Sequence, residues 1–213
     1  MEIDKDKPLP GHTKLDYDEC CALLILKELF PERYSDLVIA DKPDLQGTKI
    51  GVEVTIAIEK DYQEVLNNWV KANSCNDENK KRKYIERMKQ LGVVYSGGVQ
   101  SWPGYKHSLE VVFDAVDAKV GKLQRGNYRS FEEFELFMFT DTWIWMRDDI
   151  IQELKEFFKN KKIYEYFSRI YILEKGYLLF TYKADGCDFL KIDIPEQSDR
   201  NIRARQLVEL AEE

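Results

Sequence analysis

The sequence predicts a single α/β domain in which helices flank a mixed sheet. Segments with apolar residues at helical spacing alternate along the chain with short runs rich in β-branched residues. Hydrophobic residues make up 44% of the 213 residues, which is enough for one large core. The sequence shows no internal repeat or low-complexity linker, so residues 15–194 are expected to form one domain.

The domain is expected to begin with a helix and two strands. Over residues 17–30, four positions from Glu19 to Phe30 follow the spacing i, i+4, i+7 and i+11 of one buried helix face, and Pro31 ends the helix. Residues 37–40 (LVIA) predict a short strand. Residues 49–58 (KIGVEVTIAI) predict the clearest strand in the chain, because β-branched residues dominate this stretch.

The same alternation continues to the end of the domain. The patterns predict helices over residues 59–72, 78–91 and 109–124, and the Gly-rich stretch 96–105 is expected to be an exposed loop. The remaining predicted elements are a strand over 135–140, a helix over 148–160, and strands over 169–173 and 177–182.

Both ends of the chain are expected to differ from the domain. Residues 1–14 are polar and contain two prolines, which predicts a flexible tail. Residues 195–213 are rich in Arg and Glu and predict a C-terminal helical tail, either an appendage of the domain or a segment that faces a partner.

Composition narrows the class of protein. No apolar stretch approaches the roughly 20 residues of a membrane span, and no signal-peptide pattern is present, so we expect a cytoplasmic protein with no membrane contact. The four cysteines contain no CxxC spacing and are expected to be reduced thiols. Two histidines are too few for a His-rich zinc site. The sequence does not set an oligomeric state.

Charge bears on a nucleic-acid partner in two ways. The net charge of −7 argues against a protein that coats nucleic acid by bulk electrostatics, but it allows a local basic groove. The predicted helix 78–91 carries a dense basic run in which Lys81, Arg82 and Lys83 are candidates for contacts with the phosphates of DNA or RNA. A solvated helix face explains the same run, and both interpretations stay open.

Asp44 and Glu53 form the pattern that most suggests chemistry. Asp44 follows Pro43, and the turn-prone residues 46–49 (QGTK) lead into the strand that carries Glu53. If these residues reverse the chain, the two carboxylates lie on adjacent strands. Glu53 has apolar neighbours on both sides, where an ionised carboxylate is unfavourable unless it is paired or binds a cation. Hard cations such as Mg²⁺ prefer oxygen ligands of this kind.

These residues resemble the motif of the PD-(D/E)XK nuclease superfamily, in which a helix precedes a hairpin that carries Pro-Asp and then Glu-X-Lys. The matching residues are Pro43-Asp44 and Glu53-Val54-Thr55, and Glu19 lies on the preceding helix where many members have an additional acidic residue. The resemblance covers residues 15–75 and rests on order and spacing. It implies a restriction-endonuclease-like mixed sheet flanked by helices. It also implies Mg²⁺-dependent hydrolysis of DNA or RNA, with Asp44, Glu53, the Val54 carbonyl and Glu19 as metal ligands.

The chain departs from the motif at one position. Thr55 replaces the lysine and cannot supply the positive charge that stabilises the developing phosphorane. Some members of the superfamily take the lysine from a helix, so Lys60, Lys71, Lys119 and Lys122 are candidates, and Lys119 is the preferred catalytic lysine. Thr55 and the negative net charge favour an alternative function, a catalytically inactive relative that serves as a nucleic-acid- or protein-interaction module.

Each candidate residue also has a purely structural interpretation. Glu19 fits a capping box with Asp16. Asp44 follows a proline, where Asp is a common turn residue. Glu53 can form a buried ion pair with a helix lysine. The position of the nearest lysine amine relative to Glu53 therefore bears most directly on the function.

Overall fold

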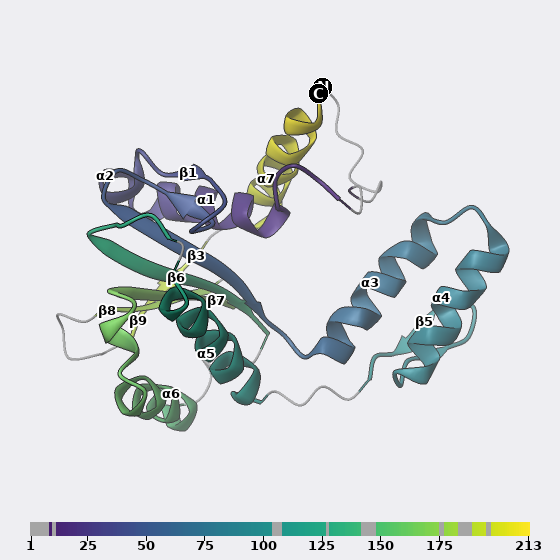
Figure 1. Ribbon diagram of the computed structural model, residues 1–213. Helices are drawn as coiled ribbons and strands as arrows, with labels where there is room; N and C mark the ends of the chain where they lie inside the picture. The colour runs from purple at the N-terminus through teal and green to yellow at the C-terminus, as the bar shows by residue number, and fades with distance from the viewer. Residues whose placement is uncertain are drawn as a thin grey trace.

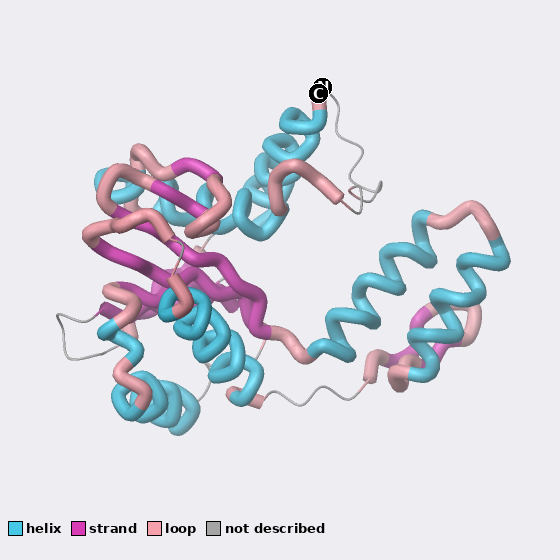
Figure 2. The backbone as a smooth tube through the Cα atoms, in the orientation of Figure 1, coloured by secondary structure: helices cyan, strands magenta, loops and turns pink. Residues whose placement is uncertain are grey.

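The structure is a computed structural model that describes residues 9, 12–103, 108–126, 128–141, 148–174, 177–182, 189–194 and 197–213. Within these residues the chain forms a seven-stranded main sheet and a separate two-stranded sheet. Helices cover both faces of the main sheet (Figure 1), and Figure 2 shows the strands in magenta between cyan helices. The main sheet has parallel and antiparallel neighbours, so the prediction of a mixed sheet flanked by helices is confirmed.

The first part of the chain forms two helices and an antiparallel meander of three strands. These elements are α1 (Tyr17–Leu29), α2 (Pro31–Tyr34), β1 (Val38–Ile39), β2 (Leu45–Gln46) and β3 (Ile50–Ala57). Helix α1 begins where the Asp16 carboxylate accepts two backbone N–H groups, as an N-cap does. The chain reversal expected between Asp44 and Glu53 is present, because β2 and β3 are antiparallel neighbours.

The segment after β3 leaves the main sheet and forms a helical arm, residues 60–103 (Figure 1). The arm contains α3 (Lys60–Ser74), α4 (Glu78–Gln90), β4 (Val94–Tyr95) and β5 (Val99–Ser101). Its helices share a small core of their own that includes Val65 and Met88. The prediction of a loop over residues 96–105 is wrong at β5, which pairs with β4. Gly97, with φ of +65°, allows the tight turn between these strands.

The chain then returns to the main sheet and completes its centre. The elements of this part are α5 (Glu110–Gln124), β6 (Glu133–Thr140), α6 (Asp148–Asn160) and β7 (Arg169–Glu174). Strand β6 pairs in parallel with β3 on one side and with β7 on the other. The predicted ends of these four elements differ from the observed ends by at most two residues.

The last part of the chain extends the sheet and adds one helix. Its elements are β8 (Tyr177–Tyr182), β9 (Leu190–Asp193) and α7 (Gln197–Glu212). Strand β8 has the predicted bounds, whereas β9 was not predicted. Helix α7 packs along α1, where Ala204 and Val208 are buried against Cys20 and Cys21. The C-terminal helix expected over residues 195–213 is therefore present, but it is packed on the domain and does not extend from it as a tail.

The core lies in two hydrophobic clusters, one on each face of the main sheet. On one face, Val116 of α5 packs in the same cluster as Leu136 of β6. On the other face, Leu26 of α1 packs with Val52 of β3. Successive strand residues point to opposite faces, so Glu53 faces α5. This alternation directs the carboxylate away from α1 and toward the helix that carries Lys119.

Two further predictions concern the membrane and the cysteines. Among the residues that the structure describes, no helix is long and apolar enough to cross a membrane. Cys20, Cys21 and Cys75 have free thiols, as expected. Cys187 and most of the predicted N-terminal tail lie outside the described residues.

Candidate functional site

The hairpin of β2 and β3 brings Asp44 next to Glu53. Leu45 pairs with Val52 in the antiparallel register, which aligns the preceding residue, Asp44, with Glu53. Glu53 is 1% exposed, and the Asp44 carboxylate accepts the backbone N–H of Val54 at 2.6 Å. The local fold alone therefore places two carboxylates together on the face of the sheet that α5 covers.

Lys119 of α5 lies between these carboxylates. Its Nζ is 3.0 Å from Oδ2 of Asp44 and 2.5 Å from Oε2 of Glu53. The Lys119 side chain is itself buried, because α5 packs against β3 at this point. The preferred helix lysine thus contacts both candidate carboxylates, whereas Lys60 and Lys71 are exposed on α3.

Lys119 remains positively charged in this setting. Burial by itself would lower the pKa of its amine. The negative charges and hydrogen bonds of Asp44 and Glu53 outweigh this effect and raise the pKa above its usual value. Two carboxylates share one ammonium, so the three side chains together carry a net negative charge.

Glu19 lies at the wall of the same site. It lines a pocket of about 390 Å³ with Asp44, Thr55 and Lys119. Burial, followed by the charges of Asp44 and Asp16, raises the pKa of Glu19 to about 7, although Lys119 opposes the shift. At neutral pH, the Glu19 carboxyl is therefore present in both its protonated and its ionised form. A side chain with a pKa near the working pH is suited to accept and release a proton.

The metal-ligand set expected from the sequence is only partly assembled. Asp44, Glu53 and Val54 lie together, but within the described ranges no group of three or more His, Cys, Asp or Glu residues is placed to hold a metal ion. Glu19 therefore lines the pocket without completing a three-carboxylate cluster. Metal binding by these residues stays a prediction.

Two pockets open beside the carboxylate pair. The first, which we call the acidic pocket, is the one that Glu19 lines together with Asp16 and Asp18. The second, which we call the basic pocket, has a volume of about 370 Å³. Its lining includes Asp44, Glu53, Lys42, Lys122, Arg125 and Tyr128. Asp44 and Lys122 line both pockets, so the pockets meet at the carboxylate pair.

The basic run on α4 lies apart from this site. Lys81, Arg82 and Lys83 belong to the helical arm, which Figure 1 shows to one side of the main sheet. Arg82 and Lys83 are exposed, and the Lys81 amine lies 3.8 Å from Glu78 one turn away. The structure therefore does not bring these residues together with Asp44, Glu53 and Lys119, and their role in nucleic-acid binding stays a prediction.

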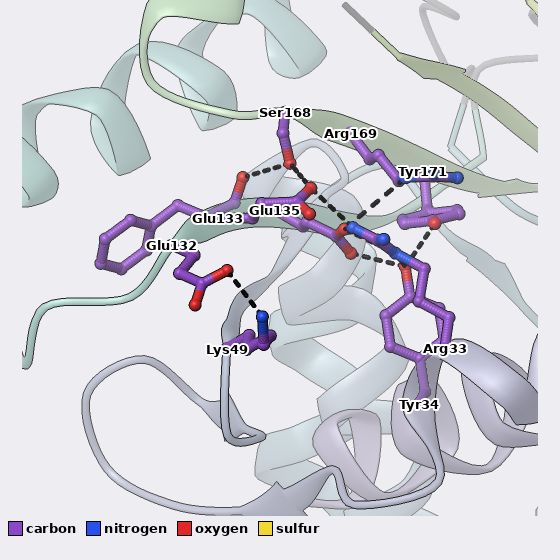
Figure 3. Close-up of polar contacts among 10 residues, drawn as sticks. Arg33, Tyr34, Lys49, Glu132, Glu133, Glu135, Ser168, Arg169 and Tyr171 are labelled. Carbon is purple, nitrogen blue, oxygen red and sulfur yellow. Dashed lines mark hydrogen bonds and ion pairs between the residues drawn. The ribbon is translucent and has the colours of Figure 1, made fainter.

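A second buried carboxylate, Glu135 of β6, was not singled out from the sequence. Its Oε1 lies 2.5 Å from Nη2 of Arg33, and its Oε2 accepts the Tyr34 hydroxyl at 2.6 Å (Figure 3). The Tyr171 hydroxyl lies 2.5 Å from that of Tyr34. Burial raises the pKa of Glu135, while Arg33 opposes the shift. Both carboxylate oxygens have partners, so this network on the α1 side of the sheet is structural.

Comparison of the chain with protein-family models, with curated proteins and with solved structures finds no match. The structure combines a mixed sheet flanked by helices with a site in which two carboxylates of the β2–β3 hairpin contact one helix lysine. Its function has to be inferred from that chemistry.

Proposed function

We propose that this protein is a metal-dependent nuclease with a restriction-endonuclease-like fold that hydrolyses phosphodiester bonds of nucleic acid. One observation carries the proposal. The Lys119 amine contacts both Asp44 and Glu53. A lysine from α5 thereby supplies the positive charge that the strand motif lacks at Thr55.

The order of elements supports the same proposal. Helix α1 precedes the hairpin, Asp44 comes immediately before β2, and Glu53 follows on β3. Glu19 is on α1 and lines the pocket that Asp44 shares. This is the order of helix, Pro-Asp hairpin and acidic strand on which the resemblance to PD-(D/E)XK nucleases rests.

The chemistry of the donor atoms suits a Mg²⁺ ion, although the carboxylates contact Lys119 in this structure. Asp44, Glu53 and the Val54 carbonyl would hold the ion through oxygen atoms, which Mg²⁺ prefers. Glu53 is almost fully buried and already requires a cation, which Lys119 supplies in this structure. When bound, Mg²⁺ lowers the pKa of a coordinated water and neutralises charge on the phosphate.

The side chains of the site would have three further roles in the reaction: stabilising charge, accepting a proton and positioning a carboxylate. Lys119 stabilises negative charge that develops on the phosphate oxygens during attack by water. Glu19, whose pKa is about 7, accepts a proton from the attacking water. Asp44 is held by the Val54 N–H, which keeps its carboxylate aligned with Glu53.

A cleavage assay with plasmid DNA and RNA in Mg²⁺ or Mn²⁺ tests the proposal. Asp44→Ala, Glu53→Gln and Lys119→Met should each lower the rate by about 100-fold or more. Lys161→Met is the matched control, because Lys161 forms an exposed ion pair with Asp117 on the outer side of α5. Retained cleavage in the Asp44→Ala variant, or cleavage that persists in EDTA, would contradict the proposal.

The second candidate is a catalytically inactive relative that acts as an interaction module. The same contact favours it, because a buried Lys119–Glu53 pair explains the burial of both groups without any metal. Melting curves with divalent ions separate the two functions. The nuclease predicts a higher melting temperature with Mg²⁺ or Mn²⁺ that Asp44→Ala abolishes. The inactive module predicts no response to the ions. A less stable Glu53→Gln variant is expected in both cases, since Lys119 loses a partner.

A further inference from the structure

We propose that the basic pocket binds a backbone phosphate of the nucleic acid, through Lys122 and Arg125 with help from Lys42. The inference rests on the proposed function for the identity of the ligand. It adds a binding site that lies beside the carboxylate pair and that the strand motif does not contain.

The geometry of α5 directs two cations to this pocket. Lys119 and Lys122 are three residues apart and share a helix face. Because the Lys119 amine contacts Asp44 and Glu53, Lys122 lies one turn further along the same face and lines both pockets. Arg125 is the C-cap residue of α5. Its side chain folds back over Gly121, and its Nη1 lies 3.6 Å from the point that a Cβ atom on Gly121 would occupy.

The charges of these two side chains are available to a ligand. Among the residues that the structure describes, neither Lys122 nor Arg125 has a carboxylate within 4.0 Å. By contrast, Lys119 and Lys161 both have carboxylate partners. Lys42 lies 3.9 Å from the adjacent Asp41 in a highly exposed pair, and such pairs are weak.

The two pockets differ in their balance of charge. The acidic pocket has four carboxylates and two lysines in its lining: Asp16, Asp18, Glu19, Asp44, Lys119 and Lys122. The basic pocket has three cations and three carboxylates: Lys42, Lys122, Arg125, Asp41, Asp44 and Glu53. Because Asp41 lies beside Lys42, and Asp44 and Glu53 both contact Lys119, the positive charges of Lys122 and Arg125 favour a phosphate on this side. Guanidinium groups bind phosphate oxygens in a bidentate manner.

Tyr128 links the basic pocket to the carboxylate pair. Burial, together with a hydrogen bond to Glu53, raises the pKa of the Tyr128 hydroxyl above its usual range. The hydroxyl therefore stays protonated and gives its one hydrogen to Glu53, so it holds the carboxylate in place at the boundary of the pocket. A phosphate held by Lys122 and Arg125 would place the neighbouring phosphodiester over Asp44 and Glu53, which is the orientation that hydrolysis needs.

Binding in EDTA tests the inference without any hydrolysis. Fluorescence anisotropy measures the affinity of a labelled short duplex DNA, and of a labelled RNA in a parallel series, over a range of salt concentrations. Lys122→Ala and Arg125→Ala should each weaken binding on the order of tenfold and reduce the slope of log K against log salt by about 0.9 for duplex DNA. Lys161→Ala removes the same charge from the segment after α6, where Lys161 pairs with Asp117 of α5, and should leave affinity unchanged. Asp44→Asn should tighten binding, since it removes a negative charge beside the phosphate.

Each outcome decides between the two proposals. If the parent cleaves nucleic acid while Lys122→Ala and Arg125→Ala bind as tightly as Lys161→Ala, the phosphate site is wrong and the nuclease proposal stands. If both variants lose binding but the parent cleaves neither polymer, the phosphate site stands and the catalytic proposal fails. A parent that binds neither polymer overturns the inference. Both side chains then serve only to complement the C-terminal dipole of α5, and their removal lowers stability alone.

Discussion

Lys119 supplies a positive charge to two carboxylates at once. Lys119→Met keeps most of the side-chain length but leaves the buried Glu53 without its counter-ion. We expect this variant to lose about 3–5 kcal/mol of unfolding free energy at neutral pH. Urea denaturation at neutral pH measures this loss.

A second substitution serves as the control for this prediction. Lys119→Met combined with Glu53→Gln should recover much of the lost stability, since the variant no longer buries an unpaired charge. Lys161→Met should change the unfolding free energy by no more than about 1 kcal/mol, as expected for an exposed pair. A Lys119→Met variant as stable as the parent at neutral pH would show that Glu53 does not depend on this amine.

Glu19 makes a separate prediction about pH. Its pKa is about 7 in the folded protein, above the ordinary glutamate value of 4.5, because burial and Asp44 favour the protonated form. The folded state therefore binds more protons than the unfolded state between these values, so this residue lowers stability as the pH rises from about 4.5 to 7. Glu19→Gln should be more stable than the parent by about 1–2 kcal/mol at pH values above about 7.

The same substitution has an effect on catalysis. If Glu19 accepts the proton of the attacking water, the cleavage rate of the parent should increase through a pH of about 7. Glu19→Gln should lower the rate and remove that step from the pH profile. A variant with an unchanged pH profile would leave Glu19 as a residue that only lines the pocket.

At this scale, one buried glutamate was predicted from the sequence and another was not. Glu53 was singled out because a carboxylate among apolar strand residues needs a partner, and the structure provides Lys119. Glu135 lies in an equally apolar stretch, FELFMF, and the same argument applies to it. It was missed because no nearby Pro-Asp pattern drew attention to it. Its partners Arg33 and Tyr34 lie about a hundred residues away in sequence.

Among the secondary-structure elements, α4 offers the most direct test of nucleic-acid contacts outside the site. Changing Lys81, Arg82 and Lys83 together to Glu should weaken DNA or RNA binding and flatten its salt dependence if the helix tracks a phosphate backbone. Anisotropy titrations in EDTA measure this change. The apolar core that α3 and α4 share, which includes Val65 and Met88, is unchanged by these substitutions and should keep the arm folded in the variant. If binding is unchanged, the basic side chains of α4 form a solvent-exposed helix face that does not contact nucleic acid.

Long elements were predicted well from the sequence, and two of the short ones were not. Helices α5 and α6 and strands β3, β6 and β8 have strong periodic or β-branched patterns, and their observed bounds lie close to the predicted ones. Strands β5 and β9, which were not predicted, contain three and four residues. A run this short carries no periodic signal. Its conformation depends on the neighbouring strand, which the sequence does not reveal.

At the scale of the whole molecule, α7 tests whether the C-terminal helix is part of the stable fold. Val208 is buried between α7 and α1. Val208→Asp places a charge in this contact and should lower the unfolding free energy by about 3 kcal/mol or more. Leu210→Asp is the matched control on the same helix, because Leu210 is 57% exposed. Equal stability of the two variants would show that α7 contributes little to the packed domain.

Some contacts in the site join residues that are close in sequence, and others join residues that are far apart. This difference has a consequence for folding kinetics. Asp44 and Val54 are separated by 10 residues, whereas Lys119 is 66 residues from Glu53 and 75 from Asp44. Contacts between nearby residues form sooner than contacts that close a long loop. The hairpin should therefore bring its two carboxylates together before Lys119 arrives. During that interval only solvent ions screen their repulsion, so refolding should be slowest at low ionic strength and should accelerate when salt is added.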